Sequence, residues 1–276
     1  MSSTTDYANA FGFHSVVAAV VFGVVYIPLF LWFVRQSIKN MTYVYISLSI
    51  FCLMRVVAFI LRAILIKATS LQDNLNVFIA DQIMFGVGFF ALLYSAFTLV
   101  LDREVVSGAQ HTHYLPLRIM GDKRLFRIIL IVGVVLGVKG TIDATSSNTS
   151  TASSGSTLRR ASTILFLVLT ILQTIQTFLV FNEERPIASH RPFGDRHGKY
   201  ILCLVSLFLL VREVFMIATI GELARQDKEV LWFPFVALPE VFCVFCYAIS
   251  GLVPPRSELK KQIEMNEAME AQYPQN

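Results

Sequence analysis

The stretch KYILCLVSLFLLVREVFMIATI, residues 199–220, is almost entirely apolar, yet Arg212 and Glu213 stand side by side beyond its midpoint. Its length matches the roughly 20 residues that an α-helix needs to cross the ~30 Å hydrocarbon core of a bilayer. The stretch therefore predicts a membrane-spanning helix that carries two ionisable side chains within the membrane.

Runs of similar length and composition recur along the chain. The seven runs are 13–34, 42–66, 77–101, 125–144, 161–181, 199–220 and 231–253. Strong alternation of polar and apolar residues with period two is absent, which argues against a transmembrane β-barrel. The run 125–144 is the weakest, because Gly133, Gly137 and Gly140 lower its helix propensity, and six spans are the alternative. We predict an all-α polytopic membrane protein, a bundle of seven transmembrane helices.

The overall composition supports the same fold class. The chain is 55% hydrophobic and 15% charged, whereas soluble globular domains are about 25% charged. We expect a short extracellular or lumenal N-terminal segment over 1–12, a transmembrane domain over 13–253 and a cytosolic polar tail over 254–276. The first run is too long for the apolar part of a cleaved signal peptide and no basic segment precedes it, so we expect it to remain as an anchor.

The basic residues predict the orientation in the membrane. Fourteen Lys and Arg residues fall in the loops after the first, third and fifth runs and in the tail, against six on the opposite side. Because basic residues favour the cytosolic side, we expect the N-terminus outside and the C-terminus in the cytosol. The segment TSSNTSTASSGST, residues 145–157, is then a flexible outer loop, and Asn148 begins a glycosylation sequon within it.

Six ionisable residues fall inside the predicted spans, and their depths can be counted along each helix. These six candidate ligand-binding residues are Arg55, Arg62, Asp81, Arg212, Glu213 and Glu240. At about 1.5 Å per residue, Arg55 and Arg212 both lie ~20 Å from the inner boundary, and Glu240 reaches a similar level. Arg62 lies two helical turns further out than Arg55 and matches Asp81 in depth. The depths therefore predict two levels in the membrane, and at each level side chains of opposite charge lie at the same depth.

Ionisable side chains at this depth cost about 2.5–3.5 kcal/mol each on insertion scales, and they normally face the bundle interior or a water-filled cavity. One interpretation is a buried network that fixes helix packing. The other is a polar cleft among the second, third, sixth and seventh helices that accepts a headgroup in the outer half of the bundle. Adjacent helical residues point about 100° apart, so Arg212 and Glu213 are not expected to serve one partner directly.

In the second interpretation each charged residue has a role. The three arginines contact phosphate or other acceptors, and Glu213 and Glu240 balance them or bind an amine. Pro234 and Pro239 would bend the seventh helix, so that freed backbone groups could line the cleft. The sequence contains no phosphate-binding loop, so net transport would be passive, ion-coupled or driven by a partner.

Short motifs in three of the runs carry a family resemblance. RVVAFILR, residues 55–62, has Ala58, Phe59 and Arg62 where the family has Gly-Tyr-x-x-Arg, and an Arg where the family has an earlier Glu. VREVF, residues 211–215, keeps the first Arg and the aromatic residue of Arg-x-x-(Phe/Tyr)-Arg-x-x-Glu. KEVLWFPFVALPE, residues 228–240, keeps most of a Glu…Phe-Asp-Ala-Leu-Pro framework, with Val236 in place of the Asp. On these motifs the chain resembles the fungal RTA1-like family of seven-helix lipid-translocating exporters.

The resemblance implies a function and a location. It implies a translocator or exporter of an amphipathic lipid or a toxic lipid-like compound, linked to stress or drug resistance. The protein would work in the plasma membrane or an endomembrane. Its partners would be membrane lipids and an amphipathic small molecule, without nucleic acid and without a cofactor.

A seven-helix receptor or sensor for a small amphipathic ligand is the alternative. Asp102, Arg103 and Glu104 end the third run, which is similar to the acid-Arg-Tyr motif of G-protein-coupled receptors. The seventh run offers Leu-Pro-Glu over 238–240 rather than the Asn-Pro of those receptors. The receptor interpretation therefore stays open at this point.

Other chemistries of seven-helix proteins lack the residues they need. A retinal protein needs a lysine in the middle of the seventh helix, and 231–253 contains none. A zinc-dependent membrane hydrolase needs several histidines at membrane depth, and only His14 borders a predicted span. Cys243 and Cys246 form a C-x-x-C pair that would need two further ligands for a metal site, so packing is the expected role. We expect no metal site and no enzymatic activity.

Overall fold

The computed structural model describes residues 15–67, 75–107, 122–146, 148–183 and 192–272. All regular structure in these residues is helical, and seven helical segments are long and apolar enough to cross a membrane. The first six are α2 (Val16–Lys39), α3 (Tyr43–Lys67), α4 (Leu75–Ser107), α6 (Lys123–Ala144), α7 (Thr149–Glu183) and α9 (Gly198–Ala218). The seventh consists of α11 (Glu229–Trp232), η1 (Phe233–Ala237) and α12 (Leu238–Tyr247) in direct succession. The predicted all-α, seven-helix fold is confirmed.

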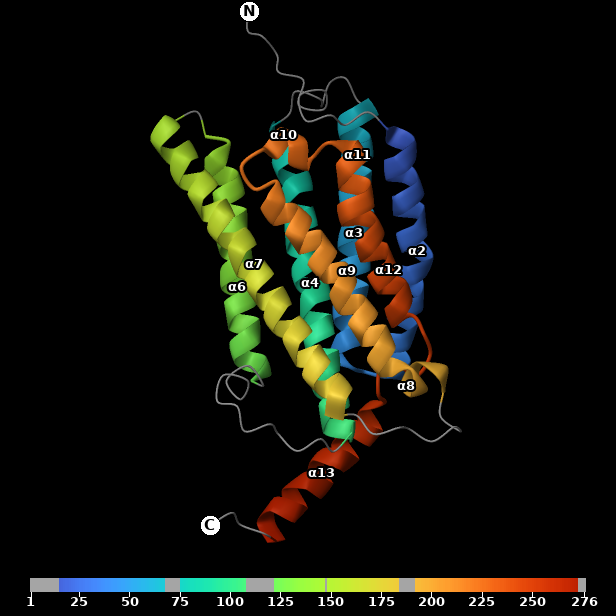
Figure 1. The fold of residues 1–276 in the computed structure, drawn as a ribbon. Coiled ribbons are helices and arrows are strands. Elements are labelled where there is room, and N and C mark those ends of the chain that lie inside the picture. Colours follow the sequence, from blue (N-terminus) through green and yellow to red (C-terminus); the bar gives the residue numbers. More distant parts are fainter. Residues whose placement is uncertain (1–14, 68–74, 108–121, 147, 184–191, 273–276) are drawn as a thin grey trace, which may run out of the picture.

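The two ends of the bundle are marked by short helices outside the spans. We call the end that carries α10 (Leu223–Gln226) the α10 end, and the end that carries α8 (Phe193–Arg196) the α8 end. The start of α2 lies at the α10 end, whereas α13 (Arg256–Gln272) extends beyond the α8 end (Figure 1). An odd number of spans requires this separation of the first span's start from the tail.

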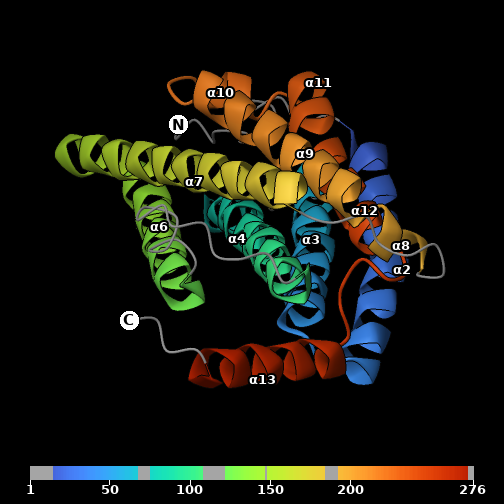
Figure 2. The ribbon, with the colours of Figure 1, turned by 60° about the horizontal axis from the view of Figure 1, so that its bottom comes forward.

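Helix α4 lies at the centre of the bundle (Figures 1 and 2). It contacts α3 on one side, α6 and α7 on the other, and also α9. Every residue over 91–101 of α4 is buried, so this half of the helix has no lipid-facing side. In contrast, α2 packs mainly on α3 at the edge of the bundle and exposes valine and isoleucine side chains.

Glycines bring α6 and α7 close together. A β-carbon at Gly140 would stand 2.6 Å from the backbone nitrogen of Arg159, and one at Gly137 would stand 2.8 Å from the Ser162 hydroxyl. That hydroxyl donates a hydrogen bond of 2.7 Å to the carbonyl of Gly133. The glycines that weaken this run as a helix therefore let two spans approach closely, as small residues do in membranes.

Helix α7 begins twelve residues before the predicted span that starts at residue 161. The expectation of a flexible loop over 145–157 is therefore wrong from Thr149 onward. Asn148 is exposed and caps the helix, because its side-chain oxygen accepts hydrogen bonds from the backbone nitrogen and the hydroxyl of Ser150 at 3.1 and 2.9 Å. Gly155 packs directly against the end of α6, and this contact outweighs the weak helix propensity of the serines and threonines.

The seventh span changes helix type where Pro234 and Pro239 predicted a bend. The backbone nitrogen of Leu238 donates to the carbonyl of Phe233, five residues earlier, and this bond defines the π-helical turn η1. The regular helix ends at Tyr247, before the predicted end at residue 253. The chain then turns through Gly251, whose φ of +85° suits a residue without a β-carbon.

Buried polar contacts fasten the α8 end. Arg103, at the end of α4, donates hydrogen bonds of 3.0 Å to the carbonyl of Asp195 and 3.3 Å to the carbonyl of Leu252. Asp102 accepts a bond of 2.6 Å from the ammonium of Lys123. The Asp-Arg pair that ends the third span thus joins three connecting segments at this end of the bundle.

Candidate functional site

Glu240 holds two buried arginines in the middle of the bundle. Arg55 Nε and Nη2 donate to its two carboxylate oxygens at 2.7 Å each, and Arg212 Nε donates to Glu240 Oε1 at 2.7 Å. All three side chains are buried. The prediction that these residues share one depth is confirmed, since α3, α9 and α12 bring them into direct contact.

The position of Arg55 depends on a glycine in the neighbouring helix. A β-carbon at Gly88 would stand 2.7 Å from Arg55 Nη1, so only glycine leaves room for the guanidinium at this point. The same nitrogen donates to the carbonyls of Phe85 at 3.1 Å and Met84 at 3.3 Å. The Phe51 ring lies 4.7 Å from the guanidinium carbon. Every face of this buried charge is therefore occupied by an acceptor or an aromatic ring.

Arg212 also forms an ion pair with the residue next to it. Its Nη1 donates to Glu213 Oε1, while Nε contacts Glu240. The guanidinium carbon lies 3.7 Å from the centre of the Phe89 ring. The expected 100° separation of Arg212 and Glu213 did not anticipate this contact, because a long arginine side chain can turn back to its own neighbour. Arg212 thus connects two carboxylates.

A second ion pair lies nearer the α10 end. Arg62 Nη2 donates to Asp81 Oδ2 at 2.9 Å, and both side chains are buried. The guanidinium carbon of Arg62 lies 4.0 Å from the centre of the Trp232 ring and 4.3 Å from that of Phe85. The predicted match in depth between Arg62 and Asp81 is confirmed. The faces of these two rings attract the guanidinium as cation–π partners and so stabilise its charge inside the bundle.

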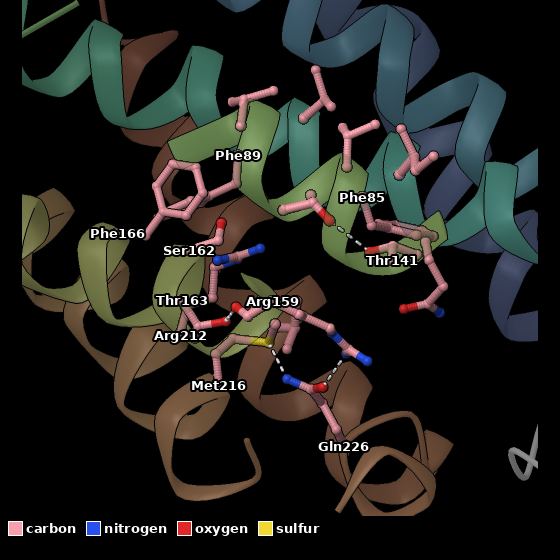
Figure 3. A pocket seen from close by; sticks show the side chains of 18 of the residues that line it. Phe85, Phe89, Thr141, Arg159, Ser162, Thr163, Phe166, Arg212, Met216 and Gln226 are labelled. Carbon is pink, nitrogen blue, oxygen red and sulfur yellow. Dashed lines mark hydrogen bonds between the residues drawn. The ribbon is translucent and has the colours of Figure 1, made fainter. Parts of the chain in front are cut away.

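A pocket opens beside these charges, and Figure 3 shows the side chains around it. Its empty volume, including the space at its mouth, is about 850 Å³. Its walls come from α3, α4, α6, α7 and α9, with α10, α11 and η1 closing the side near the α10 end. The predicted cleft did not include α6 and α7, and that part of the prediction is wrong. The predicted cleft included only the spans that carry the six ionisable residues at membrane depth.

The six predicted ligand-binding residues divide into two groups. Arg62, Arg212 and Glu213 line the pocket. The other three are not part of the pocket wall: two carboxylates bind the lining arginines from behind, and an arginine binds one of these carboxylates. These three are Arg55, Asp81 and Glu240. The pocket therefore presents one side of a charge network whose other side is packed protein.

Several polar residues of the pocket were not predicted from the sequence, and three of them lie together near the α10 end. Arg159 of α7 donates a bond of 2.6 Å to the side-chain oxygen of Gln226, whose nitrogen contacts the Met216 sulfur at 3.1 Å (Figure 3). Asp227 follows directly and is buried. From the sequence, Arg159 is one of the six basic residues expected on the outer side. The early start of α7 extends the span to Arg159, and no periodic pattern marks the segment around Asp227.

The carboxyl of Asp227 is buried close to the cations Arg159 and Arg62 and to the side-chain amide of Gln82. Burial raises its pKa to about 6, although the charges of Arg159 and Arg62 and a hydrogen bond from Gln82 favour the ionised form. Among the described residues, its Oδ2 atom has no hydrogen-bond partner. Asp227 is thus a buried carboxyl beside the pocket, and one of its oxygens has an unused hydrogen-bonding position.

The pocket has a side opening between α4 and α6. Gly86 of α4 is exposed and lines the pocket, and a β-carbon on it would meet no atom within 4 Å. Nearer the α8 end the two helices are in contact, since the rings of Phe97 and Phe126 stack with centroids 3.7 Å apart. Towards the α10 end α7 diverges from α4, whereas α6 runs roughly parallel to α4 (Figure 1). The opening therefore lies on the flank of a membrane-spanning bundle.

A family model described as "Domain of unknown function (DUF7702)" matches residues 13–253. The chain belongs to this family. The matched range equals the range assigned to the transmembrane domain from sequence, so it includes all the charged pocket residues of this DUF7702 protein. No curated protein and no solved structure matches the chain. The resemblance to RTA1-like exporters stays a prediction.

Proposed function

We propose that this DUF7702 protein is a translocator of an amphipathic lipid or a toxic lipid-like compound. The observation that carries the proposal is the combination of a charged pocket wall with a side opening at Gly86. A polar headgroup can enter such a pocket while its hydrocarbon chain stays between α4 and α6 in the bilayer. A pocket for a fully soluble ligand would not need an opening on the lipid-facing flank.

The polar contacts of the headgroup would come from three helices. Arg212 and Glu213 lie at the deep end of the pocket, and Arg159 lies near the α10 end. Arg62 faces the pocket between them. Arg62 and Arg212 already pair with carboxylates, with which a bound phosphate or carboxylate would compete, whereas Arg159 bonds the neutral amide of Gln226.

The predicted orientation places the pocket in the outer half of the membrane. Basic residues gather at the α8 end, which makes that end cytosolic and the α10 end extracellular or lumenal. This orientation also places Asn148 on the side where N-glycosylation occurs. The buried stretch 91–101 of α4 closes the inner half. Translocation would therefore require the α6–α7 pair to move away from α4 in the inner half of the membrane, where the rings of Phe97 and Phe126 stack.

A receptor or sensor is the second candidate, and one observation favours it. Arg103 binds two connecting segments at the α8 end and closes the bundle on that side. A ligand that binds Arg212 would also weaken the hydrogen bond between Arg212 and Glu240. Glu240 lies three residues after η1, so the change would reach the π-helical turn. In this alternative the pocket holds its ligand, and the signal passes through the seventh span without transport.

The experiment that distinguishes these functions is lipid scrambling in proteoliposomes. Fluorescent lipids with several headgroups are reconstituted with the purified protein, and a membrane-impermeant quencher reports how fast each lipid reaches the outer leaflet. We expect faster exchange for one headgroup class, and Gly86→Trp should abolish it by filling the side opening. Val135→Trp places the same ring on the exposed face of α6 and is the matched control.

The two outcomes separate the candidates clearly. Exchange that is blocked by Gly86→Trp and not by Val135→Trp supports transport through the pocket. Ligand binding without any exchange, in protein that is monodisperse and folded, would contradict the translocator and leave the receptor. Arg212→Ala should lower exchange as well, because it removes the deepest cation of the pocket wall.

A further inference from the structure

At the α10 end of the pocket a cation and a carboxyl lie near each other, so the charge of one affects the protonation of the other. Arg159 enters from α7, and Asp227 enters from the segment between α10 and α11. The charge of Arg159 lowers the pKa of Asp227 more than that of any other residue. When Asp227 is ionised, it therefore partly offsets the positive charge of Arg159 at the α10 end of the pocket.

The remaining groups around Asp227 do not replace it as the counter-charge of Arg159. Arg62 of α3 is held by Asp81 of α4, so that pair contributes little net charge. Gln82 of α4 and Gln226 of α10 are neutral and contribute hydrogen bonds. Protonation of Asp227 would thus leave one uncompensated positive charge, on Arg159, in a largely buried site.

We propose that the α10 end of the pocket binds a proton on Asp227 and an anionic headgroup on Arg159 together. This inference rests on the proposed function and adds to it the charge of the ligand and the ion that is coupled to it. The buried Oδ2 atom of Asp227 is where the proton binds, since no group among the described residues forms a hydrogen bond with that oxygen. The headgroup anion then takes the place of the carboxylate charge beside Arg159.

The coupling gives transport a driving force that the chain itself can use. A pKa of about 6 for Asp227 lets the site gain and lose its proton in the range between an acidic compartment and a neutral cytosol. A proton gradient across the membrane would then bias the movement of the anionic ligand. Loading of the ligand and uptake of the proton are one event at this site.

The test uses the full chain in lipid nanodiscs and decyl sulfonate as the probe, because a sulfonate keeps its charge throughout the pH range. If binding requires the protonated carboxyl, raising the pH from about 5 to about 7.5 should weaken sulfonate binding roughly 30-fold for a group with a pKa of about 6. In weak buffer near pH 7, binding should take up close to one proton per sulfonate. Empty nanodiscs correct for partitioning into the bilayer.

Two variants separate the roles of the cation and the carboxyl. Asp227→Asn imitates the protonated carboxyl, so it should bind sulfonate at both pH values as tightly as the unaltered protein does at pH 5, without proton uptake. Arg159→Gln should lose at least tenfold in affinity at pH 5. Arg160→Gln changes the exposed neighbouring arginine and is the matched control. Size-exclusion profiles and thermal unfolding establish that each variant is folded.

The possible failures have different meanings. Equal sulfonate binding at both pH values without proton uptake would overturn the coupling and leave the proposed function standing. Binding of a zwitterionic or cationic decyl amphiphile in preference to the sulfonate would overturn the choice of an anion. If none of these amphiphiles binds at any pH, the proposed function itself fails.

Discussion

Gly88 and Arg55 share one space between α3 and α4: a β-carbon on Gly88 would stand 2.7 Å from the arginine Nη1 atom. Arg55 in turn binds Glu240, which also holds Arg212 at the pocket wall. A residue that never touches the pocket therefore determines where the charged wall lies.

Gly88→Ala should destabilise the protein even though alanine favours helices. The methyl group would push Arg55 away from Glu240, and overpacking of this kind typically costs about 1–3 kcal/mol. Thermal unfolding in detergent measures the effect. Gly86→Ala is the matched control on the same helix, because its β-carbon would meet open space. If both variants unfold at the same temperature, the contact between Gly88 and Arg55 is not the constraint described.

Glu240→Gln should lower stability more strongly. The change leaves two buried guanidinium groups with a neutral partner, and removing one member of a buried ion pair typically costs about 3–5 kcal/mol. Glu222→Gln removes an exposed carboxylate that contacts Arg225 and should have almost no effect. The free energy of unfolding in mild denaturant compares the two. A loss of less than about 1 kcal/mol in Glu240→Gln would contradict the network described here.

Gly140→Ala tests the close contact of α6 with α7. In an exposed helix, replacing glycine by alanine stabilises by roughly 0.5–1 kcal/mol, whereas here the methyl group would meet the backbone nitrogen of Arg159 at 2.6 Å. Because backbone cannot move aside as a flexible side chain can, we expect the opposite sign and a lower unfolding temperature. A cysteine pair across α6 and α7 would report the separation of the helices by its rate of disulfide formation. A higher unfolding temperature for Gly140→Ala would contradict the packing.

The stability of the protein should fall as the pH rises from about 4 to about 7. The pKa of Asp227 is raised from 3.8 to about 6 by burial, so between these values the folded protein binds a proton that the unfolded chain releases. The stabilisation is fully present below the unfolded pKa and is lost as the pH rises through the folded pKa. Asp227→Asn should remove this part of the pH dependence, whereas Glu222→Gln should not. An unchanged pH profile in Asp227→Asn would contradict the assigned pKa.

Counting residues along the helices found the ion pairs because depth in a membrane is fixed by the helical rise. Arg55, Arg212 and Glu240 lie at one level for this reason, as do Arg62 and Asp81. Depth alone does not say which way a side chain points around its helix. The sequence therefore could not predict that Arg62 and Arg212 face a pocket while Arg55 and Glu240 lie behind it.

Depth along the helices could not predict that Arg159 and Asp227 belong to the pocket. The serines and threonines before Arg159 are typical of a loop, and they are helical only because Gly155 packs against α6. Asp227 lies in a short connection, whose path depends on the helices it joins rather than on a local pattern. Both residues belong to the pocket through tertiary contacts that no single segment encodes.

The π-helical turn in the seventh span also determines the spacing along the sequence of the residues that face α3. Arg55 and Arg62 are seven residues apart on a regular helix, whereas their partners Glu240 and Trp232 are eight apart on the antiparallel one. The turn over Phe233–Ala237 absorbs the additional residue, and without it Glu240 would be rotated by about 100° relative to Trp232. Loss of one residue within this turn would restore a regular helix and keep both partners in place. Loss of one residue elsewhere between Trp232 and Glu240, or gain of one, would break the match, so the length of this segment is as much a determinant of the site as its side chains.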